Sequence, residues 1–272
     1  MPRHHAVDDH SKDRSLHGTG VVGPVWARLE RAALVDPGAA VLVAPPGTGK
    51  TTGVPPALLD EPWAAAGRIV VLEPRRLAAR MAAERMASTA GERVGKAFGY
   101  SVRGERAGGP RTRVEVVTEG LFVRRIQSDP TLEGVTAVLL DEFHERSIDG
   151  DLALALLLDV RASLRPDLRV LVMSATIDPA PVAALLGGHG PPAPIVEAVA
   201  PIFPVETRSR PGSAHDPIED RVAEVVAEAV RVDHGDVLVF LPGRPEIRRT
   251  GAALQRNGVA GHVDVVELHG SM

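Results

Sequence analysis

Short apolar runs alternate with amphipathic stretches from residue 41 to residue 186. Apart from Glu115 and Thr136 the runs are unbroken, as is typical of strands buried on both faces of a sheet. The predicted strands are Val41–Val43, Ile69–Leu72, Val114–Val117, Thr136–Leu140 and Val170–Met173. The predicted helices are Leu77–Thr89, Leu121–Gln127, Asp151–Arg161 and Pro181–Leu186. Strands that alternate with helices indicate βαβ units, so we expect an α/β domain with a mostly parallel central sheet flanked by helices.

The pattern changes after a stretch rich in proline and glycine at Gly187–Pro194. The sequence then predicts a helix at about Pro217–Val232, a strand at Asp236–Gly243, a helix at Pro245–Asn257 and a strand at Val263–Gly270. These are too few strands for a complete α/β domain. We therefore expect a disordered polar tail at 1–20, an α/β domain at 21–200, a connector at 201–215 and an incomplete second unit at 216–272.

Composition narrows the class of protein. The 272 residues are 44% hydrophobic and 24% charged, which suits a globular chain with a proper core. The absence of cysteine excludes disulfides and thiolate metal sites and agrees with a cytoplasmic protein. No apolar run approaches the about 18 residues of a membrane span, so no membrane partner is expected. With a net charge of −4, any nucleic-acid binding must come from a local patch.

The strand at Val41–Val43 leads into the loop Ala44–Thr51, whose letters APPGTGKT match a P-loop except that Ala44 replaces the first glycine. Gly47 and Gly49 allow backbone N–H groups to curve around phosphates. The following helix points its positive end at the same place. A chance glycine-rich turn is the alternative, but the strand before and the helix after favour phosphate binding.

The end of this loop supplies the side chains that a nucleoside triphosphate needs. Lys50 is expected to reach the β- and γ-phosphates, and the Thr51 hydroxyl is expected to bind Mg²⁺. We therefore predict ATP and Mg²⁺ as cofactors. The predicted nucleotide contacts are Pro46, Gly47, Thr48, Gly49, Lys50, Thr51 and Thr52.

Two acidic residues, Asp141 and Glu142, follow the predicted strand that ends at Leu140. Ligands of open α/β sheets bind at the carboxyl ends of the strands. There Asp141 can hold Mg²⁺ together with Thr51, partly through water, and Glu142 can orient or deprotonate an attacking water. A solvated Asp-Glu turn is the alternative, which the presence of the P-loop disfavours.

Two further segments carry polar groups whose role the sequence leaves open. Ser174 and Thr176 follow the strand Val170–Met173 and can bridge the acidic residues to another part of the protein, although a helix cap before Asp178 is an equal alternative. Gly99–Arg106 contains the one tyrosine of the chain and two arginines. It predicts either a stacking and phosphate-binding segment or a packed edge strand.

Arg75 and Arg76 follow the predicted strand Ile69–Leu72 at the start of a helix, and Thr118 directly follows the predicted strand Val114–Val117. Guanidinium, hydroxyl and backbone N–H groups in such places contact the phosphates of nucleic acids. We therefore expect Arg75, Arg76 and Thr118 to bind a single strand of RNA or another nucleic acid. Ordinary helix-start chemistry and plain surface charge are equal alternatives.

Taken in order, the segments APPGTGKTT, LEPRRLAAR, VTEGL, DEFHER, MSAT, FPVE and VLVFLPG resemble the DEAH-box branch of superfamily 2 helicases. The sequences of these segments are most similar to those of the bacterial HrpB-type helicases. The resemblance implies a RecA-like P-loop domain that binds ATP and one nucleic-acid strand, and a second RecA-like unit. It implies catalytic roles for Lys50, Asp141, Glu142 and His144, and it implies that His144, Ser174 and Thr176 couple nucleotide state to strand binding.

The sequence lacks two segments that the family carries in its second domain, TNIAETS-like and QRxGRAGR-like, whose arginines reach the γ-phosphate. We therefore expect this chain by itself to bind ATP, to hydrolyse it poorly and not to unwind duplexes, unless another polypeptide supplies the missing second RecA-like domain. The alternatives are a non-catalytic module that binds ATP and RNA, and an unrelated P-loop kinase.

Overall fold

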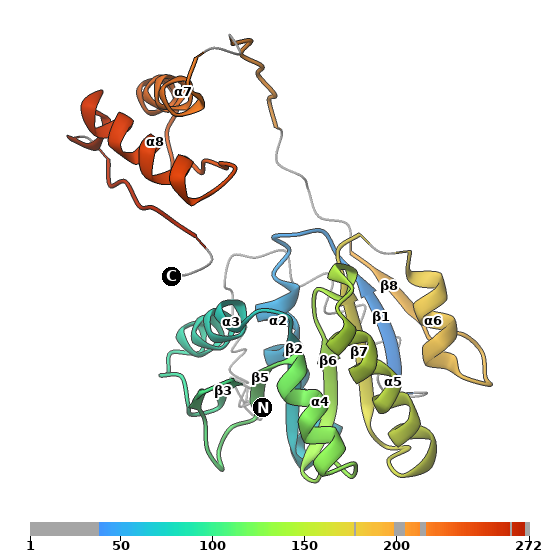
Figure 1. The fold of residues 1–272 in the computed structure, drawn as a ribbon. Coiled ribbons are helices and arrows are strands. Elements are labelled where there is room, and N and C mark those ends of the chain that lie inside the picture. Colours follow the sequence, from blue (N-terminus) through green and yellow to red (C-terminus); the bar gives the residue numbers. More distant parts are fainter. Residues whose placement is uncertain (1–37, 177, 199–204, 213–215, 262, 270–272) are drawn as a thin grey trace, which may run out of the picture. The chain divides into compact units, whose positions relative to one another are not determined.

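The computed structural model describes residues 38–176, 178–198, 205–212, 216–261 and 263–269. The polar tail expected at 1–20, the residues up to 37 and parts of the expected connector lie outside the described residues. The chain divides into two compact units, Met1–Ile202 and Phe203–Met272, and each is described by itself (Figure 1).

The first unit is built on an eight-stranded sheet with the order β4-β3-β5-β2-β6-β7-β1-β8. All neighbouring strands are parallel except β3 and β4. The strands are β1 Ala39–Val43, β2 Arg68–Glu73, β3 Phe98–Val102, β4 Glu105–Ala107, β5 Val114–Thr118, β6 Val135–Leu140, β7 Arg169–Ser174 and β8 Ile195–Glu197. The predicted fold class is confirmed, and the five predicted strands are β1, β2, β5, β6 and β7.

Helices cover both faces of this sheet (Figure 1). They are α2 Lys50–Ala57, α3 Arg76–Thr89, α4 Glu119–Ser128, α5 Ile148–Ser163 and α6 Pro179–Gly187, with short 3-10 helices η1 Leu58–Asp60, η2 Pro62–Ala66 and η3 Phe143–Glu145. Residues of α2 and α3 share one core cluster with one face of the sheet, and residues of α4, α5 and α6 share another with the opposite face. In β1, Ala40 and Leu42 belong to the first cluster and Ala39 and Val41 to the second, which explains why the run is apolar throughout.

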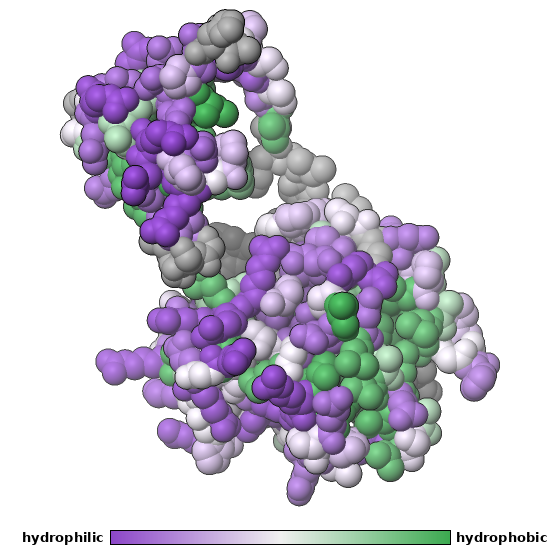
Figure 2. Space-filling view, in the orientation of Figure 1, coloured by the Kyte–Doolittle hydropathy of each residue, from purple (hydrophilic) through white to green (hydrophobic). Residues whose placement is uncertain are grey.

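Helix α5 carries more apolar side chains than its buried face uses. Its inner positions, including Leu154 and Leu157, are buried, whereas Ile148 is 88% exposed and Leu152 is 40% exposed. Figure 2 shows hydrophobic residues gathered over this helix on the face in view. Within the described part of the chain, no helix is both long and apolar enough to cross a membrane.

Strand β8 was not predicted, and the hairpin of β3 and β4 was expected only as one alternative, a packed edge strand at Gly99–Arg106. β3 has the sequence FGYSV, in which glycine and serine interrupt the apolar pattern, and β4 and β8 have three residues each. Such segments become strands only because a neighbouring strand pairs with them: β8 pairs with β1, and β4 pairs with β3. Pairing is a tertiary property, so it leaves little signal in local hydrophobicity.

The second unit contains the two predicted helices, α7 Ile218–Val232 and α8 Arg244–Arg256, followed by η4 Val259–Gly261. The helices pack through a small core that includes Ala223, Val226 and Leu254. The strands predicted at Asp236–Gly243 and Val263–Gly270 were wrong for the described residues, which form no strand at 236–243 or 263–269. A strand needs a neighbour for its backbone hydrogen bonds and for burial, and here Leu238 and Phe240 are 70% and 87% exposed.

Candidate nucleotide and nucleic-acid site

The loop between β1 and α2 has the backbone of a phosphate cradle. Gly47 and Gly49 adopt left-handed conformations, with φ of 78° and 79°, and Gly49 is the N-cap of α2. The Thr48 hydroxyl donates to the Pro45 carbonyl at 2.8 Å, which holds the turn closed from within. All predicted nucleotide contacts lie in this loop or in the first turn of α2: Pro46, Gly47, Thr48, Gly49, Lys50, Thr51 and Thr52. The helix therefore begins with its N–H groups directed toward the loop.

Ala44 stands where the P-loop pattern has its first glycine. Its side chain is fully buried in the core that β1 shares with α2 and α3. Its N–H donates to the Ser174 carbonyl on β7 at 2.9 Å. The methyl group therefore packs into the core, which explains why alanine is accepted at this position.

Lys50 and Glu142 form an ion pair at the carboxyl end of the sheet. Lys50 Nζ lies 3.3 Å from Glu142 Oε1, and the Lys50 side chain is 5% exposed. His144 Nδ1 lies 3.3 Å from the other carboxylate oxygen and accepts the Ala175 N–H at 3.4 Å. Lys50 and His144 thus lie against different oxygens of the Glu142 carboxylate.

Asp141 is the most buried acid of this edge, at 1% exposure. Its Oδ1 accepts the Glu142 N–H at 2.8 Å, and within the described residues its Oδ2 has no hydrogen-bond partner. Burial raises the pKa of Asp141, while the Thr51 hydroxyl, the Glu142 N–H and Lys50 act against that rise. A buried carboxylate oxygen without a partner is the kind of group that a bound cation would satisfy.

The residues present fit Mg²⁺ bound together with a nucleotide. Asp141 and Thr51 offer carboxylate and hydroxyl oxygens, which are the ligands that Mg²⁺ prefers. Among the described residues, no group of three or more histidine, cysteine or acidic side chains could hold a metal ion. The phosphates and water would therefore complete the coordination, as is usual for Mg²⁺ in phosphoryl-transfer sites.

The backbone after Asp141 is strained. Glu142 has a φ of 49° and Arg146 a φ of 50°, and these two residues flank η3. The Glu145 N–H donates to the Glu142 carbonyl at 2.9 Å, and Phe143 is buried beneath the turn. Left-handed conformations of non-glycine residues are costly and cluster at functional sites.

Glu73, at the end of β2, belongs to the same edge and was not predicted. β2 lies next to β6, and the Asp141 N–H donates to the Leu72 carbonyl at 3.0 Å. Glu73 is 4% exposed, and its Oε2 has no hydrogen-bond partner in the described residues. Burial, followed by the charges of Asp141, Glu142 and Glu145, raises its pKa to about 8, and Arg75 opposes the rise. An acid that ends an otherwise apolar run was the available sequence signal.

The residues predicted to bind a strand lie at the same edge of the sheet. Arg75 and Arg76 are exposed at the start of α3, and Thr118 ends β5 opposite Glu73. Arg75 Nη2 lies 2.8 Å from Glu145 Oε1. The strands β5, β2, β6, β7 and β1 are neighbours in this order. Their carboxyl ends carry, in the same order, Thr118, Glu73, Asp141, Ser174 and the P-loop.

The predicted coupling residues are placed differently from each other. Ser174 is fully buried at the end of β7, next to the strand that carries the P-loop, whereas Thr176 is exposed. The cap of α6 is Asp178, which accepts the Ala180 N–H at 3.1 Å. The alternative that Ser174 or Thr176 caps this helix is therefore wrong.

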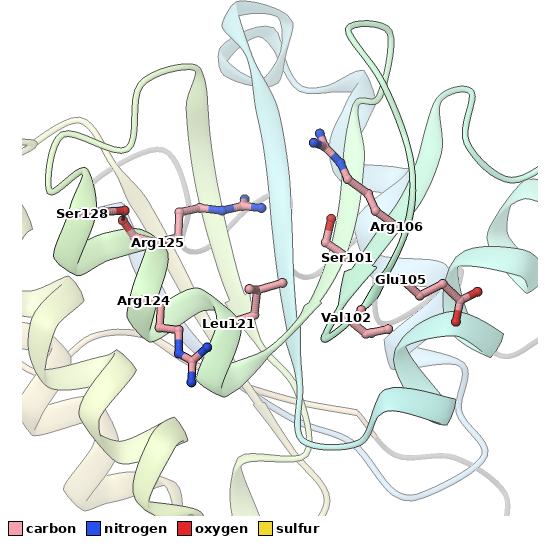
Figure 3. Close-up of a pocket in the computed structure, with 9 residues that line it drawn as sticks. Ser101, Val102, Glu105, Arg106, Leu121, Arg124, Arg125 and Ser128 are labelled. Carbon is pink, nitrogen blue, oxygen red and sulfur yellow. Dashed lines mark hydrogen bonds between the residues drawn. The ribbon is translucent and has the colours of Figure 1, made fainter.

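The segment Gly99–Arg106 forms the edge hairpin of β3 and β4. Tyr100 is 5% exposed, packs in the core on the α3 side and donates to Glu105, so its ring does not offer a stacking surface. On the other side of this hairpin, a groove of about 560 Å³ separates it from α4 (Figure 3). Its lining includes Ser101, Arg106, Leu121, Arg124, Arg125 and Ser128.

The chain is similar to known proteins in both sequence and structure. Residues 30–185 match the DEAD/DEAH box helicase family. The chain is 47% identical over 232 residues to the ATP-dependent RNA helicase HrpB of Escherichia coli (strain K12), and 34% identical over 242 residues to ATP-dependent RNA helicase HrpA of the same organism. A crystal structure of the Escherichia coli DEAH/RHA helicase HrpB superimposes with a TM-score of 0.78 at 46% identity, covering 88% of this chain and 30% of that one.

The match covers most of this chain but a minor part of its relatives. It includes 85% of this chain and 28% of HrpB, and 87% of this chain and 18% of HrpA. The family match spans more than half of the 272 residues and includes the P-loop, the acidic pair and the strand ends that surround them. The chain belongs to the DEAD/DEAH box helicase family.

Proposed function

We propose that this chain is the part of an ATP-dependent RNA helicase that binds ATP·Mg²⁺ and one nucleic-acid strand. The single observation that carries the proposal is the meeting of Lys50, Glu142 and the buried Asp141 beside a preformed phosphate loop. RNA is favoured over DNA because the relatives are named RNA helicases. Such a protein is expected to act in the cytoplasm without a membrane partner.

At the nucleotide, Lys50 would leave Glu142 and bind the β- and γ-phosphates. Asp141 and Thr51 would hold Mg²⁺, which would polarise the phosphates and neutralise developing charge. Glu142, released from Lys50, would orient the attacking water and accept its proton. The peptide N–H groups of the loop need no rearrangement, because the left-handed Gly47 and Gly49 already set the cradle.

At the strand, Arg75, Arg76 and Thr118 would contact the phosphate backbone. His144 and Ser174 are suited to couple the two ligands: His144 contacts both Glu142 and the Ala175 N–H, and the Ser174 carbonyl accepts the Ala44 N–H of the P-loop. Thr176, two residues after Ser174, is exposed and free to meet another part of the protein. The proposed nucleotide and strand contacts would then lie along one edge of the sheet.

For the 272-residue chain by itself we expect ATP binding with slow hydrolysis and no unwinding. Arginine fingers supply about 10³–10⁵ in rate in related phosphoryl-transfer systems, and in this family they come from the second RecA-like domain. A non-catalytic module that binds ATP and RNA is the second candidate function, because Lys50, Thr51 and Asp141 could bind ATP·Mg²⁺ without the arginines that speed hydrolysis. The family match leaves an unrelated P-loop kinase without support.

Two measurements on the purified chain test the proposal. Titration with a fluorescent ATP analogue, with and without Mg²⁺, should show saturable binding that depends on the metal. ATP turnover should then be measured with and without single-stranded RNA. Absence of Mg²⁺-dependent nucleotide binding would contradict the proposal, and robust RNA-stimulated turnover would contradict the expectation of slow hydrolysis.

A further inference from the structure

Arg75 and Glu145 form an ion pair between the strand-binding and nucleotide-binding parts of the sheet edge. Arg75 Nη2 lies 2.8 Å from Glu145 Oε1. Arg75 follows β2, and Glu145 ends η3, which follows β6. The Arg75 side chain is 71% exposed, and the Glu145 side chain is 32% exposed. An arginine expected to bind a phosphate of the strand is thus already occupied by a carboxylate.

The carboxylate that holds Arg75 belongs to the turn that carries Glu142. The Glu145 N–H donates to the Glu142 carbonyl at 2.9 Å, and Glu142 is in turn paired with Lys50 at 3.3 Å. Both ends of this turn have left-handed backbone, which leaves few ways for it to relax while it stays bound at both sides. A displacement of Glu145 would therefore move Glu142, the residue expected to face the nucleotide.

This edge of the sheet carries several acidic side chains and few cations to pair with them. Burial, followed by the charges of Asp141, Glu142 and Glu145, raises the pKa of Glu73, and the charge of Arg75 opposes the rise. Lys50 engages Glu142, and Arg75 engages Glu145. Both expected ligands carry phosphates, which would bind these cations: the nucleotide would bind Lys50, and the strand would bind Arg75. Binding of a strand to Arg75 would then leave Glu145 without its cation.

We propose that Glu145 occupies Arg75 in the free chain and competes with the strand phosphate for it, so that strand binding releases the turn that carries Glu142. This inference rests on the proposed function, because it needs Arg75 to bind the strand. Glu145 is a positioning residue and touches neither the reacting phosphate nor the attacking water. The pair is exposed, so the competition is modest: exposed ion pairs correspond to at most about a five-fold change in an equilibrium constant.

The experiment measures the affinity of the full chain for a fluorescein-labelled oligouridylate by fluorescence anisotropy. Glu145→Gln should bind the strand more tightly than the parent chain, by up to about five-fold, because Arg75 is no longer occupied. Glu84→Gln is the matched control. It removes the same charge from another exposed ion pair, Arg80–Glu84 at 2.9 Å on α3, and should change affinity little.

A generic charge effect is separated from competition by the variant Arg75→Ala. Arg75→Ala should weaken strand binding, and Glu145→Gln added to Arg75→Ala should then give no gain. A gain that persists without Arg75, or that Glu84→Gln reproduces, overturns the proposal. If Arg75→Ala leaves strand binding unchanged, the proposed strand contact itself fails. If Arg75→Ala weakens binding but Glu145→Gln does not strengthen it, only the competition fails.

The release of the turn has its own readout. The strand affinity of each variant is measured with and without a non-hydrolysable ATP analogue and Mg²⁺, and the ratio gives the coupling between the two ligands. In Glu145→Gln this ratio should move toward one, because the turn is no longer held by Arg75 in the free chain. A ratio equal to that of the parent chain would overturn the release of the turn. Binding of the analogue alone shows that each variant is folded.

Discussion

Two buried glutamates on neighbouring strands of the sheet have opposite surroundings. Glu115 lies on β5 and Glu73 on β2, and these strands pair in parallel. Their exposures are 2% and 4%, so burial alone would treat them alike. Their pKa values nevertheless differ widely, which makes the pair a direct comparison between a polar network of the core and the candidate site.

Glu115 is saturated with partners. Arg125 donates to both of its carboxylate oxygens at 3.0 and 3.1 Å, Arg68 donates at 2.8 Å, and the Ser101 hydroxyl donates at 2.7 Å. Burial would raise the pKa of Glu115, but these groups outweigh it and lower the pKa to about 2. The charge is therefore kept, and the network ties α4 and β3 to the strands between them.

Glu73 has carboxylates where Glu115 has guanidinium groups. Burial and the charges of Asp141, Glu142 and Glu145 raise its pKa to about 8, with only Arg75 acting in the other direction. Two buried oxygens of this edge, Glu73 Oε2 and Asp141 Oδ2, have no hydrogen-bond partner among the described residues. The edge is thus short of cations in the free chain. Buried acids that the fold leaves without partners are expected where a ligand binds, which agrees with the proposed site.

The largest expected effect is at the cation-poor edge. Lys50→Ala should weaken binding of ATP·Mg²⁺ by about 30-fold or more, because loss of one partner of a buried charged contact costs about 2–5 kcal/mol. Titration with a fluorescent ATP analogue measures the change. Lys96→Ala removes a lysine that is exposed and should leave the affinity unchanged. Equal affinities of the Lys50 and Lys96 variants would contradict the assignment of the site.

The raised pKa of Glu73 predicts that the free energy of unfolding decreases as pH rises. The unfolded chain loses this proton near pH 4.5 and the folded chain near pH 8, so the folded state binds more protons between these values and the free energy of unfolding decreases across the interval. Because one pKa unit is about 1.4 kcal/mol, the loss amounts to a few kcal/mol by about pH 8. Glu73→Gln should flatten this dependence in urea titrations between pH 5 and pH 8.5, whereas Glu133→Gln, at an exposed site, should not. A parental slope in Glu73→Gln would refute the prediction.

Removing one arginine from the hydrogen-bond network of Glu115 should cause a smaller loss of stability. Arg125→Ala leaves Glu115 with Arg68 and Ser101, and it should lower the free energy of unfolding by about 1–3 kcal/mol at neutral pH, the cost of an unsatisfied buried polar group. Arg124→Ala, one residue earlier and without an ion pair in the described residues, should cost less than about 0.5 kcal/mol. Urea unfolding measures both.

The low pKa of Glu115 adds a pH test of the same variant. Its contribution to stability is present above pH 4.5 and is lost as pH falls toward about 2. The difference between Arg125→Ala and the parent chain should therefore shrink under acid. A difference that stays constant down to the lowest pH at which the chain folds would argue that Arg125 acts through packing alone.

The smallest effect concerns the exposed cations that face the strand. Replacing Arg75 and Arg76 together by alanine should weaken binding of single-stranded RNA and make its dependence on salt shallower by about 1.4 in the log–log slope, because each neutralised phosphate of a single strand contributes about 0.7. Anisotropy titrations over a range of salt concentrations measure the slope. An unchanged slope would mean that these arginines are surface charges without a strand contact.

Much of the fold was predictable because its signals are local. The five central strands are buried on both faces, so their sequences are almost continuously apolar, and α3 and α4 each have an apolar buried face and a mostly polar outer face. The edge strands β4 and β8, and β3 next to β4, carry no such signal. The segments at 236–243 and 263–269 show the converse, since apolar residues in a row predicted strands that find no partner among the described residues.

The site divides in the same way. The P-loop is one continuous segment whose spacing already specifies a left-handed turn and a helix start, so Lys50 and Thr51 could be named from the sequence. Glu73 and the pair Arg75–Glu145 could not, because their meaning depends on β2 lying beside β6. Tyr100 was open between a core position and a stacking position, and only packing against the α3 side decided it.

The sequence by itself determined the alternation of strands and helices, the phosphate loop, and the acidic pair at a strand end, because each depends on residues that are adjacent in the chain. Tertiary structure alone decided which strand ends share one edge, in the order β5, β2, β6, β7 and β1. That order brings the buried acids of β2 and β6 together and surrounds Glu115 with arginines from β2 and α4. The electrostatic character of a buried group depends on neighbours that are distant in sequence, and only the fold supplies them.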